Sequence, residues 1–216
     1  MKKIILLLIC ITNISISQNI FQTDSINQLS EINATYYAQK QTPITHQNIK
    51  LEDIQKQSIG QEPAFIFANT PSIIAYADGG HSQGYSYFTL RGIDQTRINI
   101  TLDGVPLNDP ADQAFYFSNY ADILNSISKI QIQRGVGVSK NGNASYAGSI
   151  ELFSPQLHNN DKEIGIGYGS YNTLRAYGVY NNNINNKSLH LRVSQIYSDG
   201  FKQHSTNNSK SIFLSG

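Results

Sequence analysis

The chain has 216 residues, of which 39% are hydrophobic and only 14% charged, and its formal net charge is +1. So weak a charge excludes binding to nucleic acid or to an acidic membrane surface through a strong electrostatic field. The low charge, together with 16 glycines and 13 tyrosines, favours a strand-rich exported or barrel-forming protein over a helical cytosolic enzyme.

Residues 1–17 have the pattern of a signal peptide. Lys2 and Lys3 form a basic start, and the apolar run Ile4–Ile11 is too short to span a bilayer as a helix. Small residues before Gln18 predict cleavage there, with an uncleaved anchor helix as the alternative. The only cysteine lies in this segment, so we expect neither a disulfide nor a thiolate site in the mature chain.

Residues 18–35 are polar, and we expect them to form a flexible segment. From residue 36 the chain has the pattern of a mixed α/β region. We predict a short helix capped by Asn48, a second helix over 64–68 with Pro63 in its first turn, and a strand over 73–76.

Two segments that end in Arg-Gly follow. Arg91-Gly92 precedes the alternating strand Ile98–Leu102, which runs into an Asp103-Gly104 turn. About 40 residues later, Lys129–Gly135 repeats the pattern of alternating isoleucines followed by Arg-Gly. We expect the two Arg-Gly strands to share one sheet, with their glycines at positive φ or close to a neighbouring strand.

The remainder of the region 36–156 supplies a helix near 120–127, a last strand bearing Ile150, and two loops over 78–85 and 108–117. This order of short elements predicts an α+β domain with a small mixed β-sheet and short helices. Its length of about 120 residues is enough for a modest core.

Residues 157–216 have a different pattern, in which long strands alternate an apolar face with a small or polar face between Asn-rich turns. We predict the first antiparallel strands of a transmembrane β-barrel, the alternative being a small soluble sheet. Four strands cannot close, and a plugged outer-membrane barrel has about 22. We therefore expect a piece of a longer protein, with Leu191 and Val193 exposed on an open sheet.

Taken together and in order, the motifs resemble those of the TonB-dependent outer-membrane receptors. The resemblance covers about Leu29–Gly216 and rests on the segments Phe88–Gly92, Ile98–Asn108, Ile132–Gly135, Ser145–Ile150 and Tyr197–Phe201. Two departures, Pro71-Ser72 and Gly135-Val136 in place of the family's Pro-Gly and Gly-Pro, indicate altered turns rather than loss of the fold.

The resemblance implies a plug domain over 36–156 that fills a barrel in the outer membrane, in contact with lipid and with its N-terminus in the periplasm. It implies active uptake of a ferric siderophore or another large, scarce nutrient, driven by a TonB-type energy-transducing protein. That partner would dock by strand addition on a segment that contains Leu29, Glu31, Ile32 and Ala34; the alternative is an ordinary linker.

In the resembled family, plug arginines pair with carboxylates of the barrel wall. This assigns a plug–barrel lock to Arg91, Gly92, Arg134 and Gly135, and the alternative is that each arginine caps local carbonyls. Apical plug loops of the family contact the substrate, so the candidate substrate-binding residues are His81, Gln83, Asp109, Asp112, Gln113 and Tyr116.

No enzymatic site, metal or cofactor is predicted. The five histidines lack metal-ligand spacing, and the acidic residues near Asn108 lack the spacing of a calcium loop, so a hydrated surface is the better interpretation. Gly137–Ala144 lacks the Lys-Ser/Thr ending of a phosphate loop, and Arg and Lys are too sparse for a nucleic-acid face. The alternatives to transport are a secreted plug-like binding or signalling module and, with no nucleophile constellation to favour it, a periplasmic hydrolase.

Overall fold

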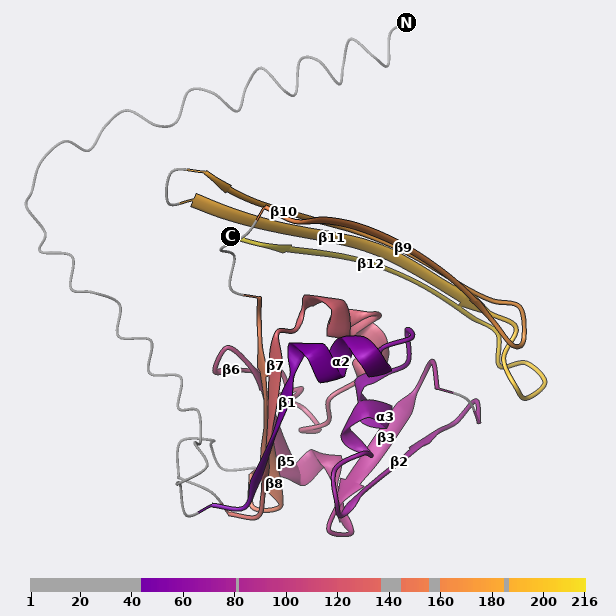
Figure 1. Cartoon of the computed structure of the whole chain (residues 1–216). Coiled ribbons are helices and arrows are strands. Elements are labelled where there is room, and N and C mark those ends of the chain that lie inside the picture. The colour runs from indigo at the N-terminus through magenta and orange to yellow at the C-terminus, as the bar shows by residue number, and fades with distance from the viewer. Residues whose placement is uncertain (1–43, 81, 137–144, 156–159, 185–186) are drawn as a thin grey trace, which may run out of the picture. The chain divides into compact units, whose positions relative to one another are not determined.

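The computed structural model describes residues 44–80, 82–136, 145–155, 160–184 and 187–216 (Figure 1). The predicted signal peptide, the segment 18–35 and the docking residues within it lie outside the described residues. The described residues belong to one compact unit. Within it, an α/β region up to residue 155 contains two small sheets, and a separate four-stranded sheet follows residue 160.

The larger sheet of the α/β region has the strand order β1-β7-β8-β5-β6 and is mixed, because β5 and β8 are parallel whereas the other pairs are antiparallel. Its register places Ile130 opposite Leu152 and Ile132 opposite Ile150, and all four side chains are fully buried. The small mixed sheet predicted from alternation is thereby confirmed. The strands are β1 (His46–Lys50), β5 (Ile98–Leu102), β6 (Val105–Pro106), β7 (Lys129–Arg134) and β8 (Gly148–Phe153).

The second sheet is antiparallel, and short helices surround it in the sequence. Pro63 lies in the first turn of α3, as predicted, because a proline there gives up only an N–H that a helix start leaves free. The strands are β2 (Ile73–Ala77), β3 (Ser86–Leu90) and β4 (Ile93–Asp94). The helices are α2 (Leu51–Gln57), α3 (Pro63–Phe67) and the 3-10 turns η1 (Gln95–Arg97), η2 (Phe117–Tyr120) and η3 (Ile123–Ser126).

Phenylalanines join the helices and sheets into one core. The ring of Phe67 meets the rings of Phe88 and Phe117 edge-on at centroid distances of 5.7 and 5.6 Å, and Phe115 meets Phe117 at 4.6 Å. All four side chains are essentially inaccessible to solvent. Each buried ring of this kind stabilises the fold by about 1.5–3 kcal/mol, so this cluster is a major part of the core.

Two predicted helix features are wrong. Asn48 does not cap a helix, because it lies in β1 opposite Gln131 and its side-chain oxygen accepts a hydrogen bond from the Gln131 amide at 2.8 Å. The predicted helix over 120–127 is broken into η2 and η3, since Asp122 between them is left-handed with φ 58°. The apolar residues expected on it, Ile123, Leu124 and Ile127, are nevertheless buried.

The two Arg-Gly strands, β3 and β7, lie in different sheets, so the expectation of a shared sheet is wrong. Their ends still meet, because a Cβ built on Gly135 would lie 3.1 Å from Nη1 of Arg91. Gly92 and Gly135 have φ of 77° and 99°, as expected. The Asp103-Gly104 turn is also confirmed: both residues have positive φ, as a two-residue hairpin between β5 and β6 requires.

The four-stranded sheet is antiparallel throughout, with the order β12-β11-β10-β9, and it curves along its length (Figure 1). One face exposes large apolar side chains, among them Ile164, Ile166 and Ile212, which are 86, 79 and 76% accessible. The other face carries buried polar residues of β11 such as Arg192 and Ser194. The strands are β9 (Lys162–Gly169), β10 (Thr173–Ile184), β11 (Lys187–Ser198) and β12 (Asn207–Ser215).

Candidate functional site

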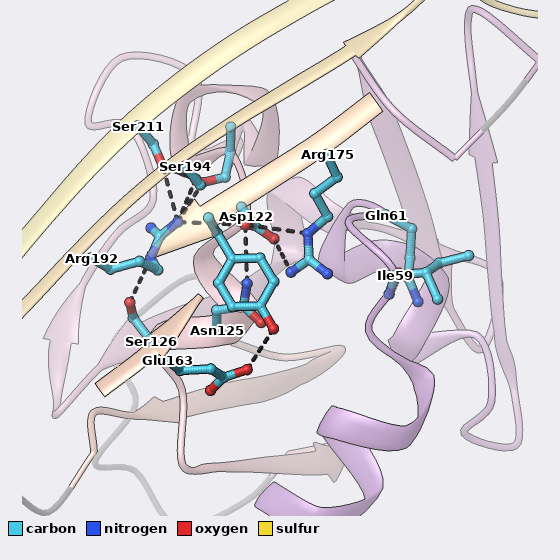
Figure 2. A network of polar contacts seen from close by, with 12 residues as sticks. Ile59, Gln61, Asp122, Asn125, Ser126, Glu163, Arg175, Arg192, Ser194 and Ser211 are labelled. Carbon is cyan, nitrogen blue, oxygen red and sulfur yellow. Dashed lines mark hydrogen bonds and ion pairs between the residues drawn. The ribbon is translucent and has the colours of Figure 1, made fainter. Parts of the chain in front are cut away.

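Asp122 connects the α/β region to the four-stranded sheet. Its side chain is almost completely buried, and Arg175 of β10 reaches it with both sides of its guanidinium (Figure 2). Nη2 of Arg175 lies 2.7 Å from Oδ1 of Asp122, and Nε lies 3.4 Å from Oδ2. A planar guanidinium matches a carboxylate in this two-point geometry, so the pair fixes orientation as well as distance.

Arg192 of β11 enters the same cluster and is buried to 2% accessibility. Its Nη1 lies 3.9 Å from Oδ2 of Asp122, donates to Ser194 Oγ at 2.9 Å and donates to Ser211 Oγ at 3.0 Å. Its Nε donates to Ser126 Oγ at 2.7 Å. Serine hydroxyls therefore accept hydrogen bonds from Nε and Nη1 of this buried guanidinium. Among the described residues its only close carboxylate is Asp122, which also pairs with Arg175.

Further polar residues extend the contact. His190 of β11 places Nε2 3.1 Å from Ser126 Oγ and Nδ1 2.6 Å from Asn181 Oδ1. The guanidinium of Arg175 also lies 4.5 Å from the ring centre of Tyr177. We call the set of Asp122, Asn125, Ser126, Arg175, Arg192, Ser194 and Ser211 the Asp122 network.

Glu62, which precedes α3, adds a second buried carboxyl beside the network. It is 6% accessible, and its Oε2 has no hydrogen-bond partner among the described residues. Burial raises the pKa of Glu62 to about 7; a hydrogen bond with the Gly84 backbone opposes this rise, and the negative charge of Asp122 adds to it. The carboxyl is therefore close to half protonated at neutral pH.

The sequence did not point to Asp122, whereas the residues predicted to lock the plug lie elsewhere. Arg91 is exposed, and Arg134 is half-buried with Nη1 3.5 Å from the Pro71 carbonyl oxygen. That carbonyl is 63 positions away along the chain, and both the pairing of either arginine with a wall carboxylate and the capping of local carbonyls stay predictions. Two arginines were the only sequence signal for the network: Arg175 and Arg192 each occupy an inward position, on two neighbouring strands.

The predicted substrate residues divide into three groups. His81 lies outside the described residues, and Gln83 is buried rather than exposed on a loop. The remaining four lie on the loop 108–117, where Asp109 and Asp112 are exposed and Gln113 and Tyr116 are half-buried. The loop is ordered by its own acids: Asp109 accepts from the Ala111 backbone N–H and Asp112 from the Ala114 N–H, at 2.7 and 2.8 Å.

Asp112 also accepts a hydrogen bond from the Tyr116 hydroxyl. This bond is the main reason why the pKa of Asp112 is lowered and that of Tyr116 is raised. The charge of Tyr87 in β3 also raises the pKa of Tyr116, and the Tyr87 hydroxyl donates a hydrogen bond to Asp78 at 3.2 Å. Tyr87 of β3 thus links Tyr116 of the loop 108–117 to Asp78, and a shared end of the domain for the two predicted loops stays a prediction.

A groove of about 510 Å³ lies between the loop 78–85 and the connection from β11 to β12. On one wall are Asp78, Gln83 and Tyr85; on the other, Lys202 donates from Nζ to the Asp78 carbonyl oxygen at 2.8 Å. The first wall contains the loop that was predicted to contact substrate, whereas the second wall was not predicted. The second wall follows the motif Tyr197–Phe201, which is part of the family resemblance.

Within the described ranges, no group of three or more His, Cys, Asp or Glu side chains could hold a metal ion. No helix of the described residues is long and apolar enough to cross a membrane.

The family model of the TonB-dependent receptor plug domain matches residues 38–149. The chain belongs to this family, with a plug domain followed by antiparallel strands that correspond to the start of a barrel. No curated protein sequence matches the chain.

Solved structures with a similar fold include three receptors. The alcaligin receptor FauA of Bordetella pertussis is 16% identical with a TM-score of 0.62, over 81% of this chain and 29% of that one. The ferric-catecholate import receptor Fiu of Escherichia coli K12 is 18% identical with a TM-score of 0.60, over 79% and 24%. The siderophore receptor PiuA of Acinetobacter baumannii is 17% identical with a TM-score of 0.59, over 80% and 23%. The chain spans less than a third of the length of each.

Proposed function

We propose that this chain is the plug and first wall strands of an outer-membrane active transporter that takes up a ferric siderophore or another large, scarce nutrient. The observation that carries the proposal is the Asp122 network. It attaches the plug to the inward face of strands whose opposite face exposes isoleucine and leucine side chains. A domain held inside a polar wall with an apolar exterior has the organisation of a gate within a membrane pore.

The outward face of the sheet supports a membrane location. Ile164, Ile166, Ile212 and Leu214 are 66–86% accessible, a face that is costly in water and favourable in lipid. The inward face carries Arg175, His190 and Arg192, which require polar partners. The alternation agrees with an outer-membrane wall, lipid on one side and plug on the other.

The Asp122 network also suggests how the plug can be attached to the wall and still be released. A buried ion pair gives up much of its attraction to desolvation, so it fixes geometry more than it adds stability. We propose that Arg91 and Arg134, with Gly92 and Gly135, make a second contact with wall carboxylates. Substrate at the outer loops, with His81, Gln83, Asp109, Asp112, Gln113 and Tyr116 as candidates, would shift the plug equilibrium and expose the docking segment, which is a coupling between two sites.

Energy would reach the plug through a TonB-type protein that pairs with Leu29, Glu31, Ile32 and Ala34. Deleting residues 29–34 from the full-length protein tests this step. Uptake of the substrate should be lost, while binding at the cell surface persists. If uptake survives the deletion, the docking assignment is wrong.

The alternative, a secreted plug-like binding module, makes a different prediction. Cell fractionation should then recover the full-length protein outside the outer membrane, and ligand binding should not be accompanied by energised uptake. Recovery in the outer membrane together with uptake that stops when the proton gradient is collapsed supports the transporter.

A further inference from the structure

We propose that Glu163 of β9 is the wall carboxylate that takes over the guanidinium of Arg175 when the carboxylate of Asp122 leaves it, an inference that rests on the proposed function and deepens it. Glu163, Tyr177 and Arg175 form a chain of contacts on the inward face of the four-stranded sheet. This chain ends at Asp122 of the plug (Figure 2). Release of the plug would then be an exchange of one carboxylate for another at Arg175.

The charges of the wall give Glu163 this role. The described strands β9, β10, β11 and β12 carry two guanidiniums, Arg175 and Arg192, and a single carboxylate, Glu163. Both guanidiniums are buried and have Asp122 of the plug as their carboxylate partner. Taking one partner from a buried ion pair is strongly unfavourable, because the other charge is left uncompensated. Once Asp122 moves away, Glu163 is the only carboxylate of these strands that can compensate either guanidinium.

Tyr177 keeps Glu163 and Arg175 apart while the plug is attached. Its hydroxyl donates to Oε1 of Glu163 at 2.5 Å, and the centre of its ring lies 4.5 Å from the guanidinium carbon of Arg175. Glu163 is exposed and forms no ion pair among the described residues. One tyrosine ring therefore separates a wall carboxylate that is held by a neutral hydroxyl from a wall guanidinium that is held by the plug.

Two glycines of β9 leave room for the two side chains to meet. The register places Gly165 opposite Tyr177 and Gly167 opposite Arg175. A Cβ on Gly165 would overlap the Tyr177 ring, so this ring lies directly on the backbone of β9. A Cβ on Gly167 would lie 3.9 Å from Cβ of Arg175, its nearest neighbour among the described residues. Because the inward surface of β9 is open beside the flexible arginine side chain, rotation of side chains brings Arg175 to Glu163 without moving either strand.

The test measures release of the plug in the full-length protein reconstituted in liposomes. Ala121 is 6% accessible, and its carbonyl oxygen accepts a hydrogen bond from the Ser211 hydroxyl of β12 at 2.8 Å. The thiol introduced by Ala121→Cys is therefore shielded until the plug leaves the wall. Its rate of labelling by a charged maleimide, located by peptide mass spectrometry, follows the fraction of released plugs.

Two variants of the contact chain should change this rate in opposite directions. Glu163→Gln should slow labelling about tenfold, because the released state then has no wall carboxylate for Arg175. The glutamine can still accept from the Tyr177 hydroxyl, so the ring keeps its place. Tyr177→Phe should speed labelling several-fold, because it frees the Glu163 carboxylate without removing it. Glu52→Gln, at an exposed glutamate of α2, is the control and should leave the rate unchanged.

A purely structural role of Glu163 predicts another pattern. If Glu163 only holds the Tyr177 ring against Arg175, Glu163→Gln and Tyr177→Phe should both speed labelling or both leave it unchanged, and either result would overturn the proposal. Melting temperatures are a second measurement. Glu163→Gln should leave the melting temperature of the unmodified protein unchanged but lower that of the Asp122→Asn variant by several degrees, because Arg175 then depends on Glu163. Equal shifts in the two backgrounds would overturn the exchange as well.

Uptake measurements distinguish failure of the exchange from failure of the proposed function. Energised uptake of a ferric trihydroxamate or triscatecholate that depends on residues 29–34, with labelling that Glu163→Gln does not slow, would keep the transporter and overturn the exchange. Slower labelling in Glu163→Gln without energised uptake of either chelate would keep the exchange and remove uptake of ferric chelates.

Discussion

The plug has two kinds of buried surface, and they are built from different chemistry. Inside the plug, Phe67, Phe88 and Phe117 pack ring against ring with no polar atom to satisfy. Against the strands, Asp122 meets Arg175 and Arg192 at defined atoms. Apolar packing tolerates small shifts, whereas a buried ion pair fails once its geometry is lost. The difference suggests a plug that stays folded as a unit while its attachment to the wall can be broken separately.

The largest expected effect comes from removing a ring from the phenylalanine core of the plug. Phe117→Ala removes a ring that contacts both Phe67 and Phe115, and it should cost about 5 kcal/mol of plug stability. Hydrogen exchange of the β7 and β8 amides in the full-length protein measures it. Ile166→Ala on the outward face is the control and should leave those amides unchanged. Equal exchange in both variants would contradict the core assigned to Phe117.

Breaking the polar side should detach the plug without unfolding it. Asp122→Asn leaves two buried guanidiniums without a carboxylate and should weaken attachment by about 4 kcal/mol. We expect increased ion leakage through the full-length protein in planar bilayers, with β7 and β8 exchange close to that of the unmodified protein. Asp112→Asn, on an exposed loop, is the matched control. Leakage equal to that control would mean that Asp122 does not hold the plug.

Glu62 makes the stability of the plug depend on pH. Its pKa is raised from 4.5 to about 7 in the folded state, so the folded state loses relative stability as pH rises from about 4.5 to about 7. The loss should amount to about 3 kcal/mol and level off above that range. Urea unfolding of the plug across this range should show the slope, and Glu62→Gln should remove it. A slope that persists in the variant would assign the effect to another group.

The smallest expected effect comes from substituting one glycine in the plug and one in the four-stranded sheet. A Cβ on Gly148 of β8 would overlap the Gln133 carbonyl oxygen, so Gly148→Ala should cost about 2 kcal/mol. A Cβ on Gly167 of β9 would lie 3.9 Å from its nearest neighbour, so Gly167→Ala should be tolerated. Thermal unfolding of the two variants compares them directly, and equal melting temperatures would contradict the close packing at Gly148.

Much of the fold followed from local patterns. Alternation predicted the strands that carry Ile130 and Ile150, and Pro63 and Asp103-Gly104 marked a helix start and a hairpin turn. These features depend on backbone preferences of a few adjacent residues, which the sequence displays directly. The break of the helix at Asp122 could not be predicted in this way, because the partners of this left-handed residue, Arg175 and Arg192, are distant in the sequence.

The site was less accessible to sequence reasoning than the fold. The partners of Asp122, Arg175 and Arg192, are 53 and 70 positions away along the chain, and no local pattern couples them. Gln83 was expected on an exposed loop because glycines surround it, yet its side chain is buried at the edge of the groove. Glycine-rich sequence predicts backbone turns well, but it does not tell where a single long side chain packs.

The contact between the Asp122 carboxylate and the Arg175 guanidinium is the main attachment of the plug to the wall in the proposed gate. A double-mutant cycle with Asp122→Asn and Arg175→Met in the full-length protein, read as plug detachment, measures their coupling. We expect a coupling energy of about 2 kcal/mol, since the two groups form a buried two-point contact. Effects of the two substitutions that add to within about 0.5 kcal/mol would contradict it.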